Sequence, residues 1–186
     1  MTAPLCRQRF TVLAGAIVLA STGCAAHATD PTPTIPPPTT THNAPAGVIL
    51  PDRALTPGAV DPQITQANIR TTICRPGYTK TVRPPTSYTT PIEEQMLTNG
   101  YTYRGDTDRT HYELDHLIPL AIGGAPRDPA NLWPQPYEAG TSGARVKDRL
   151  EVRLRDLVCS GELRLRTAQH AVAENWWTAY TTYVED

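Results

Sequence analysis

The pair Asp115-His116 combines two residue types that together can hydrolyse a phosphodiester bond. Such cleavage needs a hard divalent cation to polarise the phosphate, and a base with a pKa near neutrality to activate water. The carboxylate of Asp115 is an oxygen ligand of the kind that Mg²⁺, Mn²⁺ or Zn²⁺ accepts, and the imidazole of His116 has an unperturbed pKa of about 6.5. The pair therefore predicts a metal-dependent hydrolytic site.

The residues after this pair predict how it is positioned. Adjacent residues on a strand point to opposite faces, so Asp115 and His116 can serve one site only where the strand ends or bends. Pro119 and the Gly-Gly loop at 123–124 favour such a bend. Asn131, about fifteen residues after His116, is then expected to pin the loop through backbone hydrogen bonds and hold the imidazole in place.

The series DHLIP, GG and NLW resembles the HNH endonucleases, also called ββα-metal or His-Me finger endonucleases. Their usual form is an Asp/His-His pair, a loop, an Asn, and a metal ligand on the following helix. The wider stretch, about 70–180, also resembles small secreted bacterial proteins described as HNH-like. The resemblance implies that Asp115 is the first metal ligand, His116 the general base and Asn131 the residue that orients the loop. It also implies DNA or RNA as the substrate.

The chain departs from this pattern at the last metal ligand. Where the family usually has a His or Asn, residues 140–143 are Gly, Thr, Ser and Gly. The next candidates are Asp148 and then Glu151, which lie one turn apart on the flank of a predicted amphipathic helix over 144–158. Together with Lys147 and the nearby arginines, these carboxylates also fit a solvated, ion-paired helix face, and both interpretations remain open.

The pattern of the domain predicts an α+β fold with few strands, flanking helices and one disulfide. The resemblance implies that its core is a small ββα-metal unit. Capping residues and apolar spacing predict helices over 61–72, 91–98, 144–158 and 165–183. Alternating residues predict a hairpin of two strands, 101–104 and 110–118, around an acidic turn. A short strand over 131–133 and irregular chain over 134–143 are expected to follow.

The N-terminal segment predicts export. Two arginines precede a short apolar run at 10–20, as in the signal peptide that we expect over residues 1–28. The sequence Ser-Thr-Gly-Cys at 21–24 approximates a lipobox, while Ala-His-Ala at 26–28 fits ordinary signal peptidase, and both routes remain open. Lipidation of Cys24 would anchor the protein to a membrane of the cell envelope. Cleavage at the other site would release it outside the cell.

The exported chain divides into a linker and one domain. In the segment 29–46, twelve of eighteen residues are Pro or Thr, which predicts a disordered tether over 29–47. Residues 48–186 are then expected to form one domain, which the resemblance implies is HNH-like. Cys74 and Cys159 are the only cysteines in it, and no CxxC motif is present, so an oxidising compartment favours a disulfide between them.

Charge limits the possible functions. Loss of Arg7 and Arg9 with the signal peptide leaves 15 basic and 18 acidic residues, a net charge of −3, which argues against a protein that simply coats nucleic acid. Two functions remain open from the sequence. The first is an exported nuclease that uses a divalent cation and acts as a monomer. The second is a non-catalytic envelope protein that keeps the scaffold for binding or structure.

Overall fold

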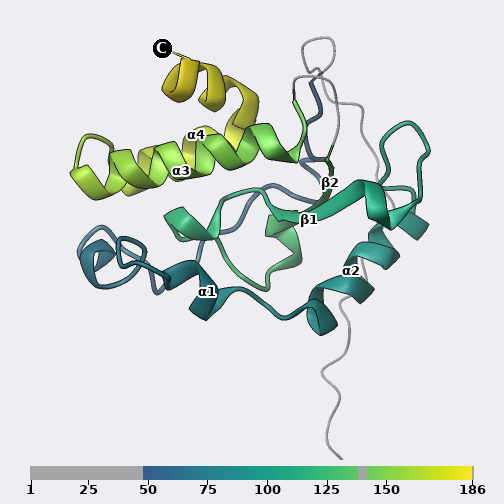
Figure 1. Cartoon of the computed structure of the whole chain (residues 1–186), viewed down its shortest axis with the longest axis horizontal. Coiled ribbons are helices and arrows are strands. Elements are labelled where there is room, and N and C mark those ends of the chain that lie inside the picture. Colours follow the sequence, from purple (N-terminus) through teal and green to yellow (C-terminus); the bar gives the residue numbers. More distant parts are fainter. Residues whose placement is uncertain (1–47, 138–141, 186) are drawn as a thin grey trace, which may run out of the picture. The chain divides into compact units, whose positions relative to one another are not determined.

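The computed structural model describes residues 48–137 and 142–185, in which two short strands are followed by a long helix (Figure 1). Strand β1 (Tyr112–His116) pairs with strand β2 (Leu132–Pro136) in antiparallel register, with Tyr112 opposite Pro136 and His116 opposite Leu132. Helix α3 (Ala144–Ser160) comes next. This mixture of helices and a two-stranded sheet confirms the α+β prediction.

The remaining helices surround these three elements (Figure 1). Helix α4 lies along α3, and α2 packs against both strands. The other elements are α1 (Tyr78–Val82), α2 (Thr86–Thr98), α4 (Leu165–Tyr180), the 3-10 turns η1 (Ile69–Thr71), η2 (Arg109–His111), η3 (Leu120–Ile122) and η4 (Pro129–Asn131), and the π-helical turn η5 (Thr181–Glu185).

Helix α3 follows its sequence pattern. Its apolar positions recur at helical spacing, and Leu150, Leu154 and Val158 are fully buried in the core. The helix ends at Gly161, whose positive φ of 88° is the left-handed conformation that commonly terminates helices. The predicted helix over 144–158 is therefore confirmed, with an end two residues later.

The predicted helix over 61–72 is wrong. Only the single turn η1 forms there. The Asp61 carboxylate accepts a hydrogen bond from the Gln63 N–H, and the Asn68 side chain bonds to the backbone of Gln63 and Thr65. Short polar side chains that satisfy nearby backbone groups in this way favour turns over a continuous helix.

The predicted hairpin is also wrong, because β1 pairs with β2 and not with the segment before it. A turn does form at the expected place, with an isolated bridge between Tyr103 and Asp106. It is attached to β1 by a side chain: the Tyr112 hydroxyl donates to the Asp106 carbonyl at 2.7 Å and accepts from the Tyr103 N–H at 2.8 Å. The backbone N–H and C=O groups of β1 therefore remain available to pair with β2.

Three further boundaries shift. Helix α2 starts at Thr86 instead of residue 91 and contains Pro91. Strand β2 runs over Leu132–Pro136, so part of the chain expected to be irregular belongs to the sheet. Its prolines are tolerated because each strand of a two-stranded sheet is an edge strand. Helix α4 ends at Tyr180, and η5 replaces the last predicted turn.

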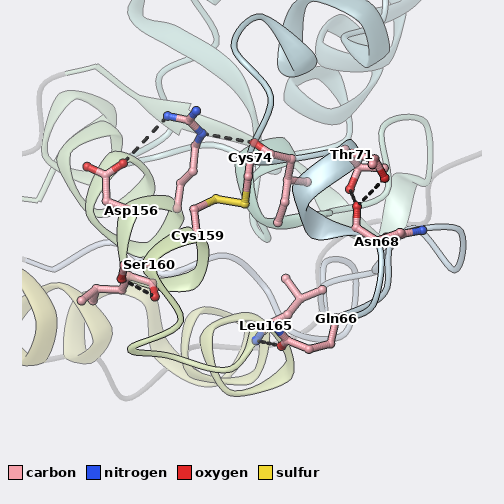
Figure 2. The surroundings of a disulfide bond; sticks show 12 residues. Gln66, Asn68, Thr71, Cys74, Asp156, Cys159, Ser160 and Leu165 are labelled. Atoms are coloured by element: carbon pink, nitrogen blue, oxygen red, sulfur yellow. Dashed lines mark hydrogen bonds and ion pairs between the residues drawn. A yellow bond between two sulfur atoms is a disulfide. The ribbon is translucent and has the colours of Figure 1, made fainter.

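The disulfide prediction is confirmed. Figure 2 shows the bond between Cys74, just after η1, and Cys159, in the last turn of α3. Near it the Arg155 Nε–H donates to the Ile73 carbonyl at 3.2 Å, and the Leu165 N–H donates to the Gln66 side chain at 2.8 Å. The crosslink and these bonds fasten the N-terminal segment of the domain to α3 and α4.

The predicted signal peptide over 1–28, Cys24 and the predicted linker over 29–47 lie outside the described residues and stay predictions. In the part of the chain that is described, no helix is long and apolar enough to cross a membrane.

Candidate functional site

Asn131 fastens the loop that connects β1 to β2. Its side chain is fully buried. The Nδ2 group donates to the carbonyls of Ile118, at 3.0 Å, and Ala125, at 3.1 Å, while Oδ1 accepts from the Ile118 N–H at 2.9 Å. One amide thus holds both ends of the loop, which is the geometry expected of the residue that pins it. Its part in catalysis stays a prediction.

The two glycines of this loop are required by close packing. A Cβ on Gly124 would collide with the carbonyl oxygen of Ile118. Gly123 has a φ of +77°, and a Cβ there would lie 2.8 Å from the Ile64 side chain. The Gly-Gly pair therefore lets the chain turn back closely against the end of β1, where the Asp-His pair lies.

His116 is the last residue of β1, and its imidazole is held in one orientation. Nε2 lies 3.0 Å from the carbonyl oxygen of Pro126, in the loop. A carbonyl can only accept, so Nε2 carries the proton and Nδ1 has the lone pair. Nδ1 makes no hydrogen bond with any of the residues that the structure describes. The tautomer is therefore the one in which Nδ1 can accept a proton.

The charge state of His116 also suits a base. Burial lowers the pKa of the imidazole. The hydrogen bond to Pro126 and the negative charge of Asp115 oppose this effect, while the positive charges of Arg83 and Lys147 add to it. The net shift is downward, so the neutral form of the ring predominates at neutral pH.

Asp115 has different partners from His116. Its Oδ2 lies 2.8 Å from the Nζ of Lys147 and accepts a hydrogen bond from the Trp133 indole at 3.1 Å. The same ammonium lies 2.7 Å from the Glu151 Oε1 and 2.9 Å from the carbonyl oxygen of His116. Asp115 is thus neutralised by a lysine from α3.

Lys147 is a site residue that the sequence interpretation missed. One of the two interpretations left open by the sequence placed it on the solvated face of the helix, but only 1% of its side chain is exposed. Burial alone would lower the pKa of this amine, yet the negative charges of Asp115 and Glu151 outweigh burial, and the pKa is raised. The amine is therefore a buried, permanent cation. A signal existed: Lys147 lies three residues before Leu150 and seven before Leu154, on the buried stripe.

The two carboxylates predicted on α3 differ in environment. Glu151 binds Lys147, and burial together with the charge of Asp115 raises its pKa in spite of that ion pair. Asp148 is exposed and makes no ion pair or hydrogen bond among the described residues. Partial loss of water around its carboxylate and the negative charge of Asp115 raise the pKa of Asp148. The structure therefore brings both near Asp115, as predicted, but only Glu151 shares a partner with it.

A groove of about 320 Å³ opens beside His116. Its lining includes Arg83, Glu93, Arg109, Glu113 and His116. Arg109 is paired with Glu93 at 3.5 Å, whereas the Arg83 guanidinium is exposed and has no ion pair within the described part of the chain. Burial, followed by the charges of Asp115 and Asp148, raises the pKa of Glu113. The groove thus combines a neutral imidazole with an available cation.

Arg83 also lines a second cleft, of about 550 Å³, on the side of α3 where Asp148 and Glu151 lie. Its charge lowers the pKa of Asp148 and of His116. Arg83 is therefore close to both halves of the candidate site. No sequence signal identified Arg83, because an isolated arginine before Pro84 fits any surface position.

No family model, curated protein or solved structure matches this chain. Any functional proposal for this chain therefore rests on the geometry of the site.

The divalent cation implied by the HNH resemblance can be tested against these side chains. Within residues 48–137 and 142–185, no three His, Cys, Asp or Glu side chains are grouped to hold a metal. Moreover, the oxygens that Asp115 and Glu151 would offer already accept hydrogen bonds from Lys147. In this arrangement the donors do not fit a metal ion between Asp115 and Glu151. Metal ligation by Asp115, Asp148 or Glu151 stays a prediction from the resemblance.

Proposed function

We propose that this chain is an exported nuclease that hydrolyses phosphodiester bonds of DNA or RNA, with His116 as the general base. The observation that supports this most is the state of His116: a neutral ring, fixed through Nε2 on the Pro126 carbonyl, in a residue that lines a groove and whose Nδ1 makes no hydrogen bond to the described residues. A general base must combine such an orientation with a pKa near or below the working pH.

The chemical step follows from that geometry. Nδ1 of His116 takes a proton from a water molecule, and the resulting hydroxide attacks the phosphorus. The bond to the leaving oxygen then breaks, and this oxygen takes a proton from solvent. Arg83, the unpaired guanidinium of the groove, is the side chain that would bind the phosphate oxygens and stabilise their growing negative charge.

A neighbouring pocket that contains two arginines supports nucleic acid as the substrate. A pocket of about 610 Å³ shares Tyr112 and Tyr137 with the His116 groove and is also lined by Arg104 and Arg145. Arg145 is exposed and makes no ion pair among the described residues. Arginines spaced along connected depressions are suited to successive phosphates of a strand, and the exposed ring of Tyr137 is suited to stacking on a base.

The test is cleavage of plasmid DNA and of single-stranded RNA by the purified chain. We expect His116→Ala to lower the rate about 10²- to 10⁴-fold, the usual contribution of a general base. His170→Ala is the matched control, because His170 is exposed on α4 away from the groove, and it should keep the parental rate. Equal rates in both variants, with unchanged unfolding midpoints, would reject His116 as the base. A parallel reaction in EDTA tests the predicted metal requirement.

One observation favours the alternative, a non-catalytic envelope protein. Lys147 neutralises the carboxylate to which the resemblance assigns the metal. If a folded parent chain cleaves neither DNA nor RNA, with or without added Mg²⁺, Mn²⁺ or Zn²⁺, the scaffold serves binding or structure.

A further inference from the structure

The Nζ of Lys147 lies within hydrogen-bonding distance of three oxygens from two elements of the fold. They are Oδ2 of Asp115 at 2.8 Å, Oε1 of Glu151 at 2.7 Å and the main-chain oxygen of His116 at 2.9 Å. An ammonium has three N–H donors, so all of them are used. The amine is therefore fully satisfied, and it joins the end of β1 to α3.

The amine occupies the position that the sequence prediction assigns to a metal ion. Two of its three partners, Asp115 and Glu151, are among the residues that the sequence predicts as metal ligands. Carboxylate and main-chain carbonyl oxygens are also the donors that hard divalent cations accept. A metal bound to Asp115 Oδ2 would have to displace the ammonium. A buried lysine would then be left without its two counter-charges, which is strongly unfavourable.

We propose that the Lys147 ammonium occupies the position of a divalent metal ion between β1 and α3 and supplies the positive charge there. The site then assembles without added metal. Removal of the lysine side chain leaves a pocket flanked by two carboxylates and a carbonyl, which is a cation site for Mn²⁺ or a similar ion. This inference concerns the occupant of the site and does not require the chain to be a nuclease.

The experiment uses the purified chain, with Mn²⁺ alone as the probe. The parent should show no change in Tm on addition of Mn²⁺ or EDTA. Lys147→Ala should melt lower than the parent, and Mn²⁺ at about 100 times its Kd should raise the Tm of this variant by on the order of 10 °C. The double variant Lys147→Ala, Asp115→Asn is the matched control and should lose most of that rise.

Two results would overturn the proposal. One is a parent that binds one Mn²⁺ ion by calorimetry and loses this binding in Asp115→Asn. The other is a folded Lys147→Ala variant that binds no Mn²⁺.

A measurement on the parent covers the case in which Lys147→Ala does not fold. Lys147 should resist an amine acylating reagent to the same extent with and without Mn²⁺, while the exposed Lys80 is modified in both samples, as read by peptide mass spectrometry. Acylation of Lys147 that increases at least 10-fold with Mn²⁺ would mean that the metal displaces the ammonium, and would overturn the proposal.

Discussion

Replacement of Lys147 by methionine should strongly destabilise the domain. Methionine keeps much of the length and the apolar stem of lysine but removes the charge and the three donors. Asp115 and Glu151 would then share a buried region without a counter-ion, and the His116 carbonyl would lose its partner. Removal of one member of a buried ion pair typically costs about 3–5 kcal/mol. We expect a loss in that range for Lys147→Met.

Urea unfolding followed by circular dichroism measures this loss. For a domain of this size it corresponds to a drop in Tm of roughly 10–20 °C. The slope of the unfolding free energy against urea should stay as in the parent, since the surface exposed on unfolding is nearly the same. Lys80→Met is the matched control: Lys80 is exposed on α1, and its loss should change stability by less than about 0.5 kcal/mol.

A triple variant separates charge from packing. In Lys147→Met, Asp115→Asn, Glu151→Gln the unpaired charges are removed together with the lysine, so part of the lost stability should return. A Lys147→Met variant that loses less than about 1 kcal/mol would refute the reasoning, because it would mean that the ammonium is not the buried counter-ion of Asp115.

Two further predictions concern the loop and the crosslink. Asn131→Leu should lower the free energy of unfolding by about 3 kcal/mol or more, because it leaves several buried backbone groups of the loop without partners. Urea unfolding measures this loss, and a value below about 1 kcal/mol would contradict the loop-pinning role. Replacing Cys74 and Cys159 by serine should lower the free energy of unfolding by roughly 4 kcal/mol in the chain-entropy model, since the bond closes a loop over a sequence separation of 85. Equal urea midpoints for this variant and the oxidised parent would contradict this prediction.

Local sequence patterns predicted those features of the fold that depend on neighbouring residues. The apolar stripe of α3 repeats at helical spacing over its whole length, so the helix was predicted nearly to its ends. The disulfide followed from counting cysteines in a domain that we predict to be exported. The loop of Asn131 followed from the order of residue types, because a buried amide can bond both ends of a short loop.

Features that depend on distant partners were not predictable in this way. The segment at β1 alternates as a strand should, but nothing local distinguishes the preceding segment from β2 as its partner. Lys147 shares the spacing of buried leucines, yet a lysine is buried only where counter-charges meet it, and Asp115 reaches it only through the tertiary fold. Arg83 likewise becomes a site residue only because α1 and the groove of His116 are brought together.

The claim that His116 acts as a general base is tested most directly by the pH dependence of kcat/KM for cleavage by the parent chain. The imidazole must be neutral to accept a proton, and burial lowers its pKa below the usual 6.5. Activity should therefore be fully present at pH 7 and fall only as the pH drops through a value below about 6.5. A limb with its midpoint above pH 7, or the same acid limb in the residual activity of His116→Ala, would contradict this assignment.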